Sequence, residues 1–184
     1  MPSKCTLIAA LASLLTGHAL AVAGDTQPAP PRPTHTSLPG RSPAVQNLLD
    51  EYYDFSMRTN PEGASTKGDL RFNDQLADVS AAALERDRAQ MRSLLDRVNA
   101  IDASALGAPD RTDLDLLRYT IEVALDSARF FPEQQPITAL SGPHIELPQL
   151  YLSIPLQNDR QLADYAARLE KMPALLHQHI DNMK

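Results

Sequence analysis

The feature that most constrains the fold is a proline-rich segment between residues 132 and 157, which separates stretches of helical periodicity. A proline has no backbone N–H, and its ring clashes with the preceding helical turn. Four prolines therefore exclude a continuous helix here and argue against a central β-strand: Pro136, Pro143, Pro148 and Pro155. Apolar side chains occur throughout residues 136–150, and a connection this long inside a compact domain is often functional. The sequence predicts one long extended connection whose apolar side chains are covered by something.

Before this segment, apolar residues recur at helical spacing between clear start and stop signals. Ser42 and Pro43 have the residue types of an N-cap and a first helical position, and Asn60-Pro61 predicts the end of that helix. Residues 61–67 can add a turn that is closed by Gly68, and residues 69–79 are predicted to form a loop.

Two more helices follow the same logic on either side of residues 102–108, a break that contains Gly107. Ser80 is expected to cap a helix with the apolar stripe Leu84, Met91, Leu94, Leu95, Val98 and Ile101. The next helix is expected to begin near Pro109 and to end at Pro132, with the stripe Leu114, Leu117, Ile121, Leu125 and Ala128.

A last helix is predicted after the connection, with Asn158 or Asp159 as its cap and Pro173 as a kink or a new start. Its inward-facing residues are expected to be Leu162, Tyr165, Ala166, Leu169 and Met172, continued by Leu175, Leu176, Ile180 and Met183. The predicted fold class is all-α, an antiparallel helical array with one long proline-rich extended connection.

The N-terminal region predicts export. Residues 1–23 have the pattern of a signal peptide: Lys4 before an apolar run and small residues suited to cleavage after Ala23 or Ala21. An uncleaved anchor is the alternative, although the run is shorter than the roughly 20 residues of a membrane span. Residues 24–41 are predicted to be a proline-rich disordered linker, and residues 42–184 the helical domain. We expect a periplasmic or secreted protein that has no membrane segment after cleavage.

Composition narrows the possible partners. Seventeen basic and 23 acidic residues give a net charge of −6, and no block of Lys or Arg is present, which disfavours nucleic-acid binding. The single cysteine, Cys5, lies in the signal region, so cleavage removes every route to a disulfide or thiolate metal site.

Familiar catalytic motifs are not found in the sequence. None of the five histidines belongs to a His-Glu-x-x-His zinc motif, and no Gly-x-Ser-x-Gly elbow occurs. His177 and His179 would be about 200° apart around a helix and are interpreted as solvated surface residues. Ser141 and His144 are close in sequence, but no third residue identifies them as a catalytic pair. We therefore predict no catalytic residue and no metal-binding residue in this chain.

An ordered set of short motifs carries a resemblance. They are Leu48–Tyr53, Asn60–Glu62, Gly68–Asp69, Arg111–Arg118, Pro136–His144, Leu147–Leu150, Asp164–Tyr165, Arg168–Leu169 and Met172–Pro173. In this order and spacing they resemble the N-terminal portion of the bacterial DUF885 family, over roughly residues 44–184. The resemblance implies a larger, mainly helical fold of the zincin metallopeptidase type, with a zinc-binding His-Glu segment beyond Lys184 and no cofactor in this chain.

The predicted function is accordingly the N-terminal fragment of an exported zinc-dependent, peptidase-like hydrolase, inactive alone. Its implied partners are a peptide substrate and the missing C-terminal region of its own parent chain. The helical pattern reaches Lys184 without a stop signal, which also favours truncation. Within the connection, His144 is the one candidate substrate-binding residue, against the simpler interpretation of a hydrogen-bonded structural histidine. The alternative function is a complete, non-catalytic periplasmic binding module.

Overall fold

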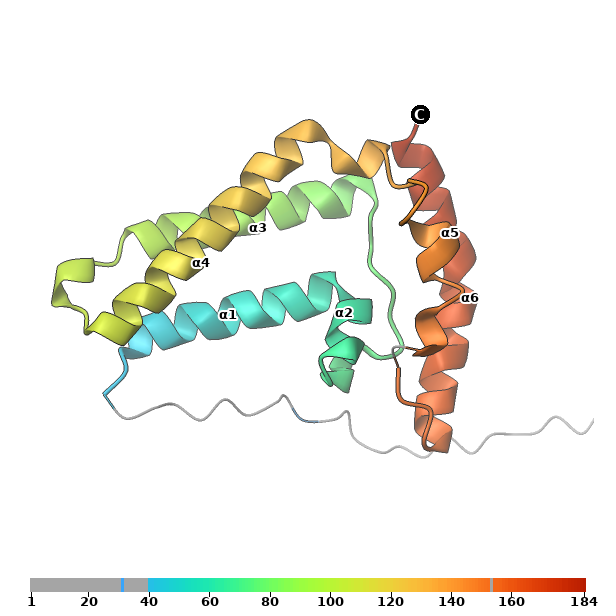
Figure 1. The fold of residues 1–184 in the computed structure, drawn as a ribbon, viewed down its shortest axis with the longest axis horizontal. Coiled ribbons are helices and arrows are strands. Elements are labelled where there is room, and N and C mark those ends of the chain that lie inside the picture. Colours follow the sequence, from blue (N-terminus) through green and yellow to red (C-terminus); the bar gives the residue numbers. More distant parts are fainter. Residues whose placement is uncertain (1–30, 32–39, 153) are drawn as a thin grey trace, which may run out of the picture.

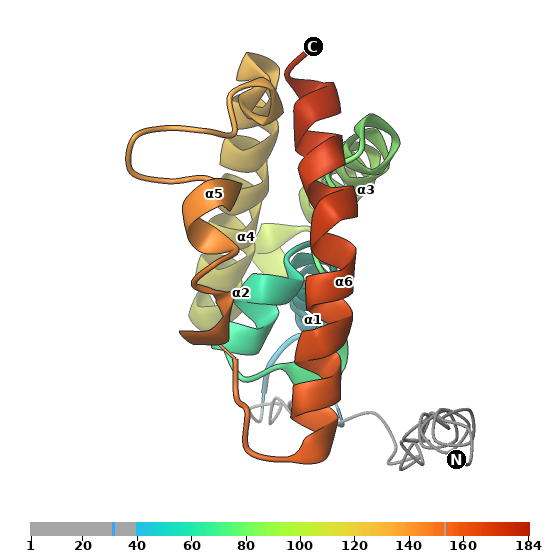
Figure 2. The ribbon, with the colours of Figure 1, turned by 90° about the vertical axis from the view of Figure 1, so that its right-hand side faces the viewer.

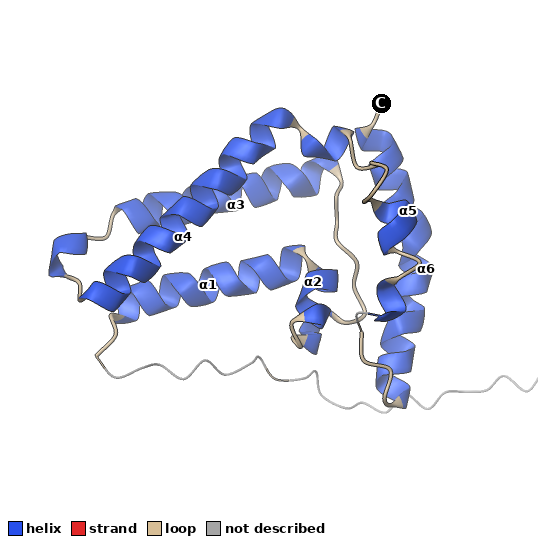
Figure 3. Cartoon of the chain, viewed as in Figure 1, coloured by secondary structure: helices blue, strands red, loops and turns tan. Residues whose placement is uncertain are grey.

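The computed structural model describes residues 31, 40–152 and 154–184, which contain six α-helices and no β-strand (Figures 1 and 3). The predicted all-α class is confirmed. The helices are α1 (Pro43–Thr59), α2 (Pro61–Thr66), α3 (Ala81–Asn99), α4 (Ala108–Ser127), α5 (Pro143–Glu146) and α6 (Asp159–Asn182). The predicted signal peptide, residues 1–23, and most of the predicted linker lie outside the described residues.

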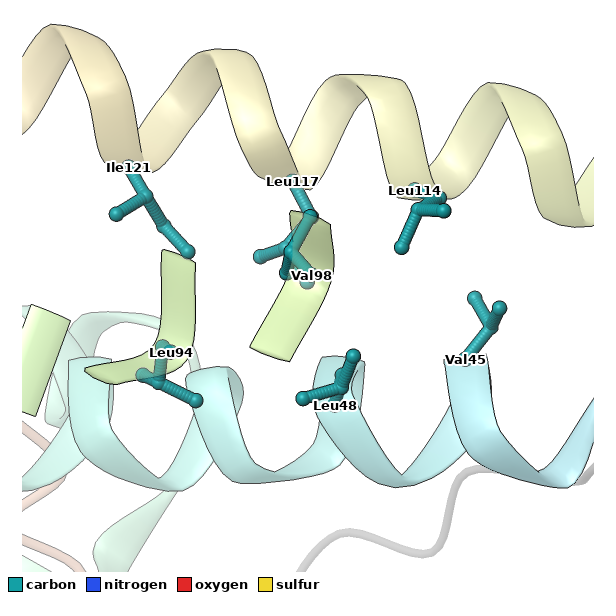
Figure 4. Packing of buried hydrophobic residues seen from close by; sticks show 7 residues of the cluster. All are labelled: Val45, Leu48, Leu94, Val98, Leu114, Leu117 and Ile121. Carbon is teal, nitrogen blue, oxygen red and sulfur yellow. The ribbon is translucent and has the colours of Figure 1, made fainter. Parts of the chain in front are cut away.

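Helices α1, α3 and α4 lie side by side, and each runs antiparallel to the one before it (Figure 1). Apolar side chains at helical spacing on all three meet in one cluster, as the periodicity predicts (Figure 4). Its fully buried members are Val45, Leu48, Leu94, Val98, Leu114, Leu117 and Ile121. This cluster is the main hydrophobic core of the described residues, and no residue of α6 belongs to it.

The start of α1 is tied to the start of α4. Pro43 occupies the first turn as predicted, but the Ser42 side chain makes no capping hydrogen bond. Instead, the backbone N–H of Ser42 donates to Asp110 Oδ2 over 2.8 Å, and Arg41 Nε pairs with Asp110 Oδ1 at 2.7 Å. Arg41 also pairs with Asp113. Arg41, the last residue of the predicted linker, is thus held by two carboxylates of α4.

Helix α2 and the loop after it are fixed by local polar contacts. Asn60 accepts a hydrogen bond from the Gly63 N–H at 2.9 Å, which caps α2, and Gly68 at φ 84° ends it in the left-handed region. In the loop, Arg71 donates from Nε to Oδ1 and from Nη2 to Oδ2 of buried Asp69. This hydrogen bonding lowers the pKa of Asp69 despite its burial.

The segment between α4 and α6 is less extended than predicted. The α-helical part of α4 ends at Ser127, before the predicted end at Pro132, and continues as a tight turn at Ala128–Phe130. Phe131 then adopts φ 48°, the left-handed conformation that redirects the chain. Pro132 and Pro143 each begin a short helical turn, because a proline needs no hydrogen-bond partner for its nitrogen at that position.

Helix α6 runs across the array, beside α2 and the N-terminal end of α3 (Figures 1 and 2). Asn158 caps it as predicted, by accepting a hydrogen bond from the Gln161 N–H at 3.0 Å. No new helix starts at Pro173; the helix continues through it and loses only the backbone bond that a proline cannot donate.

The predicted inward-facing stripe of α6 is wrong in part. Leu162 is 58% exposed, and Ala166 and Leu169 are exposed as well, whereas Leu175 is buried. The face turned toward the rest of the described chain is instead largely polar. Its residues include Asp164, Arg168, Gln178, His179 and Asn182. A periodic apolar pattern identifies one face of a helix but not the surface that covers it.

Among the described residues, no helix combines the length and the apolar character that crossing a membrane requires.

Candidate functional site

A cavity of about 590 Å³ lies between α2, the loop before α3, the 136–150 connection and α6. Its size falls within the range of pockets that bind small molecules and short peptides. Prolines and aliphatic side chains form most of its wall: Val79, Leu84, Pro132, Pro136, Pro143, Leu147, Leu150 and Leu175. The covering that the sequence predicts for the apolar connection is thus supplied in part by α2 and α6.

Helix α2 contributes Glu62 to this wall. Pro61 and the Asn60 cap fix the first turn of the helix, and Glu62 follows directly. Its Oε1 accepts a hydrogen bond from the Ala77 N–H over 3.2 Å, which ties α2 to the loop before α3. Only one oxygen of this carboxylate is used in that contact.

The connection contributes a rigid turn and Glu146. The Ser141 N–H donates to Thr138 Oγ1 at 2.9 Å, and the Thr138 N–H donates to the Ser141 carbonyl oxygen at 3.0 Å. Gly142 follows at φ 130°, and a Cβ on it would lie 2.5 Å from the Pro136 carbonyl oxygen, so only glycine fits. The Gly142 N–H donates to Glu146 Oε1 at 3.1 Å. The turn therefore positions the Glu146 carboxylate at the cavity.

Helix α6 contributes Leu175 and His179, which lie one helical turn apart. The Nδ1 atom of His179 is buried and has no hydrogen-bond partner in the described structure. Burial lowers the pKa of His179, while the nearby carboxylates of Glu146 and Glu62 oppose that shift. The imidazole is therefore neutral at pH 7 and keeps an unused polar atom.

The charged residues that line the cavity are all acidic: Glu62, Glu133 and Glu146. Glu133 is neutralised by Arg88, whose Nη2 lies 2.6 Å from Glu133 Oε1. Within the described part of the chain, Glu62 and Glu146 form no ion pair. The cavity consequently combines apolar walls with two carboxylates that form no ion pair among the described residues.

A comparison with protein families gives one match. The model for "Bacterial protein of unknown function (DUF885)" matches residues 61–184. This chain belongs to the DUF885 family. The family prediction is confirmed, and the match falls inside the predicted 44–184 range. Neither the curated proteins nor the solved structures contain a match to this DUF885 chain.

The candidate residue His144 of this DUF885 chain is exposed and does not line the cavity. It lies against Gly142, with Nδ1 3.2 Å from the position that a Cβ on that glycine would take. Ser141 does line the cavity, but its hydroxyl bonds to Thr138 Oγ1 at 2.9 Å. The role of His144 in substrate binding stays a prediction.

Three polar cavity residues, Glu62, Glu146 and His179, were not predicted from the sequence, and His179 was assigned to the surface. Its spacing from His177 identified the two as surface residues, and His177 is indeed exposed. The position of His179 beside buried Leu175 on the helix face was the available signal, but it required knowing which face of α6 is turned inward.

A zinc site needs several His, Cys, Asp or Glu side chains that converge on one point. The described part of this DUF885 chain holds no group of three or more His, Cys, Asp or Glu side chains arranged to bind a metal ion. These residues do not fit a zinc site, and we assign no metal ligand among them.

Proposed function

We propose that this chain forms the substrate-binding helical part of an exported, peptidase-like zinc hydrolase. The observation that carries the proposal is the 590 Å³ cavity, whose apolar walls surround a few converging polar groups. Such a surface suits a short peptide, whose side chains are apolar in part and whose backbone and termini are polar. The family resemblance supports the reaction class, and the cavity supports the binding role.

In this proposal, zinc and the residues that act on the scissile bond come from polypeptide outside the described residues. We infer that this chain binds substrate but does not hydrolyse it alone. When bound in that further region, the metal would polarise a carbonyl group and activate water. The residues described here would contribute binding and exclusion of solvent.

The outer face of α6 supports docking to further helical polypeptide of the same parent protein. Its exposed residues recur every three or four positions along the whole helix: Leu162, Ala166, Leu169, Pro173, Leu176, Ile180 and Met183. This is the spacing by which one helix packs against another. With 24 residues, α6 offers a seam about 36 Å long for such a contact.

We further propose that residues 1–23 direct export and that the mature protein acts in the periplasm or outside the cell. Mass spectrometry of the N-terminus of the purified protein tests this directly. A mature start after Ala23 or Ala21 supports export, and an intact Met1 in cells that export proteins normally contradicts it.

The central experiment compares the 184-residue chain with the longest in-frame product of the same gene. Metal content is measured by elemental analysis, and hydrolysis is measured with a mixed peptide library. We expect zinc and turnover only in a longer product. If the gene encodes no further helical region, and the 184-residue chain binds peptides as a stable monomer, the alternative of a complete, non-catalytic binding module replaces the hydrolase proposal.

A further inference from the structure

Two acidic side chains face the same cavity from different elements, Glu62 from α2 and Glu146 from α5. Each uses one oxygen to accept a backbone N–H, at 3.2 Å for Glu62 and 3.1 Å for Glu146. Glu62, Glu146 and His179 all line this cavity, and the two carboxylates oppose the lowering of the His179 pKa that burial causes. The remaining carboxylate oxygens are available to a ligand.

No Lys or Arg lines this cavity among the described residues. Arg168 lies next to α2 but does not line the cavity. Its fully buried guanidinium donates to the carbonyl oxygens of Pro61, Phe72 and Gln75. It attenuates the field of Glu62 without entering the cavity. A ligand that reaches the two carboxylates therefore meets negative charge that no protein cation neutralises directly.

We propose that the cavity recognises a protonated primary amine that is attached to apolar groups. The amine would donate hydrogen bonds to the remaining carboxylate oxygens of Glu62 and Glu146, and its apolar neighbours would pack against Leu147, Leu150 and Leu175. An ionised carboxylate only accepts hydrogen bonds, and an ammonium group has three N–H bonds to donate.

This inference rests on the proposed function, because it specifies the class of peptide that the cavity selects. A protonated amine with apolar neighbours occurs at the free amino terminus of a short apolar peptide and also on a lysine side chain. A metal ion is a poorer candidate, since two carboxylates and one imidazole here do not form a group arranged to hold one.

Calorimetry with the 184-residue chain distinguishes these sources. Three probes are titrated: trileucine with a free amino terminus, N-acetyl-trileucine, and N-acetyl-Leu-Lys-Leu. We expect the acetylated trileucine to bind at least about tenfold more weakly than the free peptide, because it lacks the charge-assisted hydrogen bonds. Binding of N-acetyl-Leu-Lys-Leu as tightly as free trileucine shows that a lysine side chain serves equally well, and much weaker binding restricts recognition to a free amino terminus; both results support the inference.

The variants Glu62→Gln and Glu146→Gln remove one negative charge each and keep an oxygen that can accept the backbone hydrogen bond. Each should weaken binding of free trileucine about tenfold and leave that of the acetylated peptide unchanged. Glu170→Gln is the matched control, because Glu170 is exposed on α6 outside the cavity. Circular dichroism establishes that each variant keeps its helical content, and the comparison of peptides needs no variant.

Failure of amine recognition and failure of the proposed function give different results in these titrations. If no probe binds, the cavity is not a peptide site and the proposed function loses its main support. If all three probes bind with the same affinity, the peptide site stands and recognition of an amine is refuted. Equal losses for the free and acetylated peptides in Glu62→Gln and Glu146→Gln also refute it.

Discussion

Arg168 determines how α6 is attached, and Arg168→Met should loosen that attachment. The guanidinium is completely buried and donates to Gln75 O at 2.7 Å, Ser65 Oγ at 2.8 Å, Pro61 O at 2.9 Å and Phe72 O at 3.1 Å. These acceptors lie on α2 and in the loop before α3. Methionine keeps much of the aliphatic stem and removes every donor, so the variant isolates the contribution of the hydrogen bonds.

Two opposing effects determine how much free energy of α6 docking is lost in Arg168→Met. Hydrogen bonds that involve a charged group contribute about 1.5–3 kcal/mol each. Removing the cation also relieves the cost of burying it, a cost that lowers the pKa of Arg168, and apolar replacements of buried charges are often nearly neutral.

Which effect is larger depends on how many hydrogen-bond acceptors lose their only donor when Arg168 is removed. The Pro61 carbonyl keeps a bond from Ser65 Oγ, and the Phe72 carbonyl keeps one from the Gln75 N–H. The orphaned acceptors are thus fewer than the bonds lost. We expect a net loss of about 2 kcal/mol in the free energy that docks α6.

Because α6 contributes nothing to the α1–α3–α4 cluster, this loss should affect α6 before the core. Urea unfolding followed by far-UV circular dichroism should show an early partial loss of helix, and hydrogen exchange should rise in residues 159–182. Arg92→Met is the matched control, since Arg92 is exposed and pairs with Glu85; it should change stability by less than about 0.5 kcal/mol. A single transition at the wild-type urea midpoint in Arg168→Met would show that these hydrogen bonds do not hold α6 in place.

Three further predictions concern the core, a turn and pH. Leu114→Ala should lower the free energy of unfolding by about 3 kcal/mol because Leu114 is fully buried. Leu116 is 61% exposed on the same helix, so Leu116→Ala should change the free energy of unfolding by less than about 0.5 kcal/mol. Equal effects of the two variants in urea unfolding would contradict the core assignment. Gly68→Ala should cost about 1 kcal/mol because φ is 84° there and no contact can compensate, and thermal unfolding of that variant at the wild-type midpoint would argue against the left-handed turn. Burial lowers the pKa of His179, so the unfolded chain binds more protons below the ordinary value of 6.5 and stability should fall as pH drops through that value. His179→Gln should reduce this slope in urea unfolding and His177→Gln, on the exposed side of α6, should leave it; an unchanged slope in His179→Gln would place the imidazole in solvent.

The sequence predicts the α1–α3–α4 array well because its signals are local. Ser42-Pro43 and Ser80 place the starts of α1 and α3, and the stripes on the three helices coincide with the buried cluster. Helix propensity, capping and periodicity all act within a few residues, and here each favours the same structure. These signals suffice because the three helices cover one another's apolar faces.

The candidate site could not be predicted in the same way, since it depends on which face of α6 is turned inward. An arginine between Ala167 and Leu169 carries no local signal of burial, and it becomes buried only because three backbone carbonyls of α2 and the following loop converge on it. The same orientation brings His179 to the cavity and leaves Leu162 and Leu169 exposed. Periodicity identified the stripe of α6 but assigned it to the wrong surface.

The orientation of α6 links the cavity to the proposed partner. A helix attached mainly by hydrogen bonds on one face, with an apolar seam on the other, gains little hydrophobic stabilisation from the described chain itself. Covering that seam would fix α6 against α2 through Arg168 and hold His179 and Leu175 at the cavity wall. Binding at the cavity and docking at the seam should therefore strengthen each other, because both require the same placement of α6. In Arg168→Met, binding of free trileucine should weaken although Arg168 does not line the cavity; unchanged affinity, measured by the same calorimetry, would show that the cavity forms independently of how α6 is held.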